Sequence, residues 1–140
     1  MQLHNVHITL AFVGSIDAAT RDCMQAVAGQ VRGQAFELQL NQLGYWPRPK
    51  VVWLGSESVP PAAIDLQQGL VHELQACGFE PEKRPFHPHL TLMRKVHSGL
   101  SHTKIDNIAW SVSDFVLVRS NTLSTGVEYE VIARWPLIEN

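Results

Sequence analysis

The residues best suited to chemistry form a short pattern that occurs twice. His7-Ile8-Thr9-Leu10 and His89-Leu90-Thr91-Leu92 both read H-x-T-L. Each copy places a histidine two positions before a threonine, and residues two apart share one face of a β-strand. On a strand, each copy therefore presents an imidazole beside a hydroxyl. If the two strands lie side by side, they build a site with two histidines and two threonines.

This set of side chains suits the hydrolysis of a cyclic phosphodiester. In-line attack needs a base that accepts a proton from water and an acid that protonates the departing oxygen. Histidine serves either role near neutral pH, because its unperturbed pKa is about 6.5. Threonine hydroxyls can donate to the non-bridging phosphate oxygens. His7 and His89 are therefore candidate catalytic residues, and Thr9 and Thr91 are candidate phosphate ligands.

Two other functions stay open on the residues alone. One is a metal-dependent hydrolase, in which His4, His7, His87 and His89 supply ligands through an H-x-x-H and an H-x-H spacing. Neither cluster has Asp, Glu or Cys beside it, and zinc ligation leaves the repeated threonine unexplained. We therefore expect no metal and no cofactor. The other function is a module that binds a nucleotide or an RNA end without turnover.

Hydrophobic periodicity predicts the elements that must position the two motifs. Residues 4–14 and 89–96 alternate as strands, so both motifs fall on strands. A helix is predicted from an Asp17 N-cap to about Arg32, with Gly33 ending it. A second is predicted from Pro60 to about Gly78, with apolar positions recurring at helical spacing: Ala63, Leu66, Leu70 and Leu74. The other predicted segments are strands at 36–40, 51–55, 110–119 and 127–135, an aromatic turn at 44–47 and a polar loop at 97–107.

Composition bounds the class of protein. The 140 residues are 45 % hydrophobic and 17 % charged, which is typical of a globular protein, and we expect one α+β domain over residues 1–140. No apolar run reaches the roughly 18 residues of a membrane span, and no signal-peptide order is present, so a cytoplasmic location is expected. The net charge of −2 argues against coating long nucleic acid. Cys23 and Cys77 are expected to be reduced thiols.

The paired motif resembles that of the 2H phosphoesterases, and in particular the bacterial RNA 2′,3′-cyclic phosphodiesterases, historically called 2′-5′ RNA ligases. The resemblance implies a bilobal α+β fold with two pseudo-symmetric antiparallel sheets, flanked by helices around a central cleft. In that family a strand and a helix usually precede the first motif, whereas six residues precede His7 here. We therefore expect an unpaired sheet edge, which a homodimer is one way to cover. The stretches that carry the resemblance are HITLAFVG (7–14), PRPKVVWLG (47–55), RPFHPHLTLMRK (84–95) and the ending 115–137.

The resemblance also implies an activity. RNA 3′ ends or small nucleotides with a 2′,3′-cyclic phosphate are hydrolysed to 2′-phosphomonoesters without metal, with weak 2′-5′ ligation in reverse. It implies that His7 is the proton donor and His89 the acceptor, with Thr9 and Thr91 on the phosphate.

Arg94 matches a basic position that helps to hold the phosphate in the family. Strict alternation would put Arg94 on the opposite face from His89, so a bulge or strong twist is expected between them. Tyr45, Trp46 and Phe86 are candidates either to stack on a base or to fill structural positions.

Overall fold

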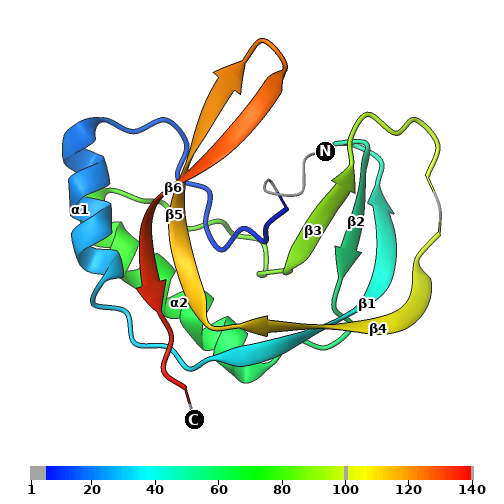
Figure 1. Cartoon of the computed structure of the whole chain (residues 1–140), viewed down its shortest axis with the longest axis horizontal. Coiled ribbons are helices and arrows are strands. Elements are labelled where there is room, and N and C mark those ends of the chain that lie inside the picture. The colour runs from blue at the N-terminus through cyan, green and yellow to red at the C-terminus, as the bar shows by residue number, and fades with distance from the viewer. Residues whose placement is uncertain (1–5, 100, 140) are drawn as a thin grey trace. The chain divides into compact units, whose positions relative to one another are not determined.

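The computed structural model describes residues 6–99 and 101–139, and it is mixed α+β as predicted. The chain divides into two compact units, each assembled from separate stretches of the sequence. Unit 1 consists of Met1–Thr9, Glu37–Val59 and His87–Ser111, and unit 2 of Leu10–Phe36, Pro60–Phe86 and Val112–Asn140. Among the described residues, neither helix has the length and apolar character that a membrane crossing requires. The elements, labelled in Figure 1, are α1 (Ala18–Ala28), β1 (Phe36–Trp46), β2 (Val51–Gly55), α2 (Pro61–Leu74), a 3₁₀ turn η2 (Gln75–Cys77), β3 (His89–Met93), β4 (Thr103–Val112), β5 (Asp114–Leu123) and β6 (Gly126–Pro136).

Unit 1 is built on a four-stranded sheet in the order β3-β2-β1-β4. The prediction of β2 is confirmed at both ends, and all five of its residues are buried because it lies inside the sheet. β1 runs farther than predicted: Gly44, Tyr45 and Trp46 continue the strand instead of forming a turn. Antiparallel pairing with β2 explains this, since Gly44 faces Trp53 and Trp46 faces Val51. The turn is therefore confined to residues 47–50.

Gly44 is needed where it stands because the Trp53 ring crosses over it. A Cβ at Gly44 would lie 2.1 Å from Cζ2 of Trp53, far inside van der Waals contact. Trp53 is only 1 % exposed, so the indole has little room to move away. The absence of a side chain on β1 thus lets β2 hold a large aromatic ring against the sheet.

Unit 2 contains both helices. The predicted N-cap of α1 is confirmed: the Asp17 carboxylate accepts a hydrogen bond from the Thr20 amide at 2.7 Å, and hydrogen bonding with the Thr20 side chain, then with this amide, lowers the pKa of Asp17. α1 ends at Gly29 and not at Gly33, because the Gly29 amide closes the last turn on the Gln25 carbonyl. α2 buries its predicted apolar positions. These are Ala63, Leu66, Leu70 and Leu74.

A hydrophobic cluster joins the helices of unit 2 to its two-stranded antiparallel sheet, β5-β6. Phe115 stacks on Trp135 across the β5-β6 pair, with ring centroids 5.2 Å apart. The prediction of one strand over 110–119 is wrong, because Ser113 separates β4 from β5. The predicted polar loop at 97–107 is also shorter, since β4 already begins at Thr103.

The two cysteines form a disulfide, which corrects the prediction of reduced thiols. Cys23 lies in α1 and Cys77 in η2, 54 positions apart in the sequence, and their Cα atoms are 5.8 Å apart. That Cα separation is within the range a disulfide spans. The disulfide could not be predicted from the sequence, because only the packing of α1 against the end of α2 brings the two cysteines together.

Candidate functional site

All five residues predicted for the site belong to unit 1. The two motifs meet through an antiparallel bridge between their central residues, Ile8 and Leu90. In such a pairing the flanking residues also face each other, so His7 lies across from Thr91 and Thr9 across from His89. Directly opposite Cβ atoms are about 4.5–5.5 Å apart. Each histidine is therefore next to the threonine of the other motif, and all four share one face.

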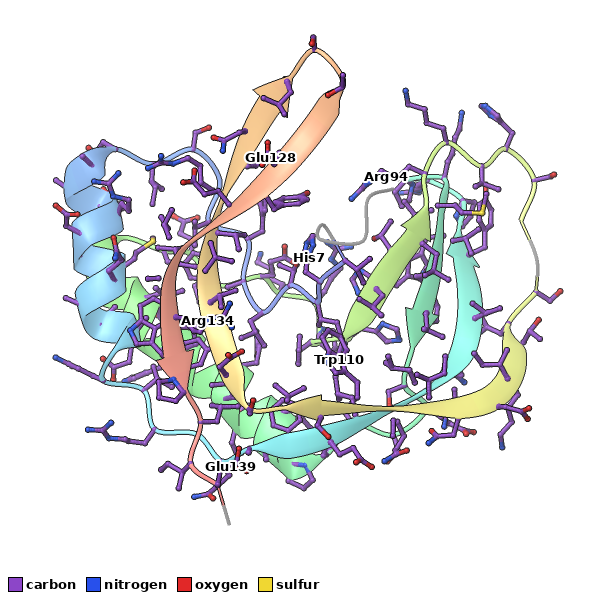
Figure 2. All side chains as sticks on the ribbon, in the orientation of Figure 1. His7, Arg94, Trp110, Glu128, Arg134 and Glu139 are labelled. Carbon is purple, nitrogen blue, oxygen red and sulfur yellow. A yellow bond between two sulfur atoms is a disulfide. The ribbon has the colours of Figure 1, made fainter. Side chains whose placement is uncertain are left out.

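The strand predicted over 4–14 is wrong beyond this bridge. The chain leaves unit 1 after Thr9, so Ile8 is the one described residue of the segment that pairs with β3. Phe12, an apolar residue of this segment, is 79 % exposed. His4 and the rest of residues 1–5 lie outside the described residues. Figure 2 shows His7 on this N-terminal segment.

β3 presents His89 and Thr91 on the same face of the sheet as Trp53. The register pairs His89 with Gly55 and Thr91 with Trp53, and residues paired across strands share a face. Leu90 between them is buried, with 7 % of its surface exposed. The alternation that the motif predicts is thus confirmed for the second copy. Apolar packing behind Leu90 holds the imidazole and hydroxyl on the opposite face.

The bulge expected before Arg94 is present in β3. Trp53 pairs with Thr91, but the next residue of β2 toward its start, Val52, pairs with Met93, so Leu92 is an extra residue. One inserted residue reverses the alternation that follows it. Arg94 therefore falls by parity on the face of His89, beyond the end of β3 (Figure 2). The strand ends at Met93, earlier than predicted.

A backbone contact fixes the tautomer of His89. Its Nδ1 lies 2.7 Å from the carbonyl oxygen of His87. A carbonyl only accepts, so Nδ1 must carry a proton and donate it. In neutral His89 the free lone pair is then on Nε2. The Trp46 ring stands edge-on to the imidazole, with centroids 4.6 Å apart, and restrains its orientation.

An aromatic cluster packs around Trp53 on the face of the sheet that carries His89 and Thr91, the histidine face. Trp53 contacts Trp46, His87 and His102, with ring centroids 5.1, 4.9 and 5.4 Å away. Burial lowers the pKa of His87, and the charge of nearby His89 lowers it further. The indole Nε1 of Trp53 is buried without a hydrogen-bond partner. Among residues 6–99 and 101–139, no group of three His, Cys, Asp or Glu side chains is placed to hold a metal ion.

The sequence predictions missed the role of this cluster. Tyr45 fills a structural position, one of the two roles predicted for it, because its hydroxyl donates to the Val96 carbonyl at 2.6 Å. Trp46 does contact a catalytic candidate, but at its edge. Phe86 belongs to unit 2. The signal that could have found the cluster is Gly44 directly before two aromatic residues on a strand, since glycine in a strand often marks a close neighbour.

Comparisons with known proteins find one family. A sequence model described as the 2′-5′ RNA ligase superfamily matches residues 1–122. The RNA 2′,3′-cyclic phosphodiesterase of Escherichia coli K12 is 33 % identical over 136 residues, covering 96 % of this chain and 77 % of the relative. The RNA 2′,3′-cyclic phosphodiesterase of Thermotoga maritima is 30 % identical and covers 91 % of this chain and 73 % of its own length. The chain thus spans about three quarters of both proteins.

A solved structure is similar over the same extent. The crystal structure of Escherichia coli LigT complexed with 3′-AMP aligns with a TM-score of 0.87 and 34 % identity. The alignment covers 95 % of this chain and 77 % of that one. The fold similarity therefore includes both compact units.

Proposed function

Because the chain belongs to the 2′-5′ RNA ligase superfamily, we propose that it hydrolyses 2′,3′-cyclic phosphate ends of RNA to 2′-phosphomonoesters. The observation that carries this proposal is the antiparallel meeting of the two H-x-T motifs at Ile8 and Leu90. That pairing supplies two histidines and two threonines on one face, the set that a cyclic phosphate needs. The names of the Escherichia coli and Thermotoga maritima relatives support the same activity.

The proposed reaction divides the two proton transfers between the histidines. His89 accepts a proton from water on Nε2, the nitrogen left free by the contact of Nδ1 with the His87 carbonyl. The water oxygen attacks phosphorus, and the bond from phosphorus to the ribose 3′-oxygen breaks. His7 donates its proton to that 3′-oxygen, which leaves the phosphate on the 2′-oxygen. The pair then exchanges protons with solvent before the next turnover.

The remaining side chains bind the phosphate. Thr9 and Thr91 lie beside the histidines and can donate hydroxyl hydrogen bonds to the non-bridging oxygens. The guanidinium of Arg94 offsets the negative charge that develops on those oxygens, and the bulge at Leu92 gives it the required face. Attack by an RNA 5′-hydroxyl in place of water would give a 2′-5′ linkage by the same proton transfers.

The test is hydrolysis of an oligonucleotide that ends in a 2′,3′-cyclic phosphate, with and without EDTA. The product is identified by its sensitivity to phosphatase and by comparison with 2′- and 3′-phosphate standards. We expect a 2′-phosphate at equal rates in both reactions. A 3′-phosphate product would show that the 2′-oxygen leaves instead of the 3′-oxygen. Inhibition by EDTA would favour the metal-dependent alternative.

A binding module without turnover is the second candidate. Tight binding of 2′-phosphorylated ends, together with no product after long incubation, would favour this candidate. Purified protein that contains stoichiometric zinc would instead favour the third candidate, in which histidines are metal ligands.

A further inference from the structure

Two adjoining loops of unit 1 gather four cationic side chains. Arg48 and Lys50 lie in the turn between β1 and β2, and Arg94 and Lys95 follow β3. β2 is antiparallel to both neighbours, so the turn and the loop are at the same end of the sheet. The Val96 amide donates to the Lys50 carbonyl at 3.0 Å, which joins the two loops directly. All four cationic residues are exposed.

Among the described residues of unit 1, no carboxylate lies beside these two loops. The sequence has no Asp or Glu from 38 to 56 or from 83 to 105. Unit 1 places its three acidic residues elsewhere: Glu37 is near the start of β1, Glu57 follows β2 and pairs with Lys104, and Asp106 is in β4. Among the described residues, the ion pairs of the chain involve other cations. The positive charge of the two loops is therefore available to a ligand.

The backbone at two of these cations is unfavourable for lysine. Lys50 has φ 58° and Lys95 has φ 60°, and among the described residues they are the only non-glycine positions with positive φ. Glycine or asparagine adopts this conformation more easily than lysine does. Backbone strain of this kind gathers at functional sites. The chain thus carries a cation on each loop where a smaller residue would fit the backbone better.

Apart from Arg94, the cationic residues of the two loops are too far from the motifs to hold the reacting phosphate. Lys95 lies four residues after Thr91, and a strand rises about 3.3 Å per residue, so roughly 13 Å of extended chain separates their Cα atoms. Arg94 lies between the two and stays with the reacting phosphate. A ligand that uses both places must therefore carry several phosphates in a row.

We propose that Arg48, Lys50 and Lys95 bind the RNA backbone upstream of the cyclic end, so that an oligonucleotide is the preferred substrate over a mononucleotide. This inference rests on the proposed function. Contacts with backbone phosphates are electrostatic and independent of sequence. The surface should therefore select for RNA length and not for base identity.

The test replaces both strained lysines, as Lys50→Asn with Lys95→Asn. Asparagine tolerates the left-handed backbone, so the loops keep their shape while two charges are lost. The matched control is Lys83→Asn with Lys104→Asn, which removes two exposed lysines outside the cluster. Each protein is assayed on an octanucleotide with a 2′,3′-cyclic phosphate end and on 2′,3′-cyclic AMP.

We expect the cluster variant to lose about tenfold in kcat/KM on the octanucleotide, through KM, while cyclic AMP is hydrolysed within twofold of wild type. The salt dependence on the octanucleotide should weaken by about 1.4 in log–log slope, at about 0.7 per phosphate contact. The control variant should match wild type on both. Equal losses on both substrates, or no loss on either, would overturn the proposal.

The proposal also has a test if the protein does not turn over either substrate. Fluorescence anisotropy then measures binding of a 2′-phosphorylated octanucleotide and of 2′-AMP. Weaker octanucleotide binding by the cluster variant alone supports the surface even though the proposed function has failed. Binding that is the same in all three proteins refutes it.

Discussion

The two units of the chain differ in charge and in what they bury. Unit 1 has five Lys and Arg against three Asp and Glu, a formal +2, whereas unit 2 has six against ten, a formal −4. The whole-chain value of −2 conceals this contrast. Unit 1, with both H-x-T motifs and the cationic loops, is the one suited to a phosphate. The net charge of a chain is therefore a poor guide to its ligands when the units differ.

The units also differ in their packing. Unit 2 contains both helices, the Cys23–Cys77 disulfide and the cluster around Leu66 and Phe115. Unit 1 packs aromatic rings and histidines against one face of its sheet, and leaves the Trp53 Nε1 without a partner. Substitutions in unit 2 should therefore act first on stability, and those on the histidine face first on turnover.

The largest expected effect is on turnover from unit 1. His7→Ala and His89→Ala should each lower kcat about 10²- to 10⁴-fold, because each removes one proton transfer. Thermal unfolding should stay close to wild type, since neither change leaves a cavity in the cluster of unit 2. Steady-state kinetics measure kcat, and circular dichroism melts measure thermal unfolding. A histidine variant that keeps near wild-type kcat would contradict the assignment of turnover to unit 1.

In unit 2 the expected effect is on stability. Leu66 is 1 % exposed, and Leu66→Ala should cost about 2–5 kcal/mol of unfolding free energy, because it leaves a cavity between the helices and β5-β6. Urea denaturation measures this loss. At temperatures where the variant remains folded, its kcat should match wild type. A large fall in kcat of the folded variant would show that the core of unit 2 affects turnover as well as stability.

Gly44→Ala tests whether the aromatic cluster supports the histidine face. The new methyl group collides with the Trp53 ring, and overpacking of this kind costs about 1–3 kcal/mol. Because Trp53 contacts His87 and Trp46 contacts His89, kcat should fall as well as stability. Gly69→Ala is the control, since its Cβ would meet only ordinary contact at 3.7 Å from Val31. An unchanged kcat in Gly44→Ala would show that the aromatic cluster does not support catalysis.

His87 should give the smallest effect, one that depends on pH. Its pKa is lower in the folded chain than in the unfolded chain, so the unfolded state binds more protons below about pH 6.5. Folding stability must then fall as the pH drops through that value toward the folded pKa. His87→Gln should lose less Tm than wild type between pH 7.5 and pH 5.5. The His87 carbonyl, which orients His89, is retained in this variant, so activity at pH 7.5 should change little.

Local pattern was enough to predict several parts of the fold. The Asp17 N-cap, β2 and the buried positions of α2 followed from capping and periodicity. The alternation of His89, Leu90 and Thr91 is a short-range property and was also predictable. The bulge before Arg94 was expected from the family resemblance, which implies that Arg94 helps to hold the phosphate, whereas strict alternation would put it on the opposite face from His89.

Long-range packing accounts for what the sequence did not predict. Of the strand predicted over 4–14, the described residues from 6 onward form only a bridge at Ile8, because the chain moves to unit 2 after Thr9. Cys23 and Cys77 meet only when α1 packs near η2. The extension of β1 through Trp46 depends on its pairing with β2. In each case the deciding partner is distant in the sequence.

The most direct test of the central claim, that His7 and His89 are the acid and the base, is the pH dependence of kcat/KM. The wild type should give a bell, since His89 must be neutral and His7 protonated. Residual activity of His89→Ala should lose the acidic limb, and that of His7→Ala the alkaline limb. A wild-type profile without a bell, or variants that keep both limbs, would contradict the two-histidine mechanism.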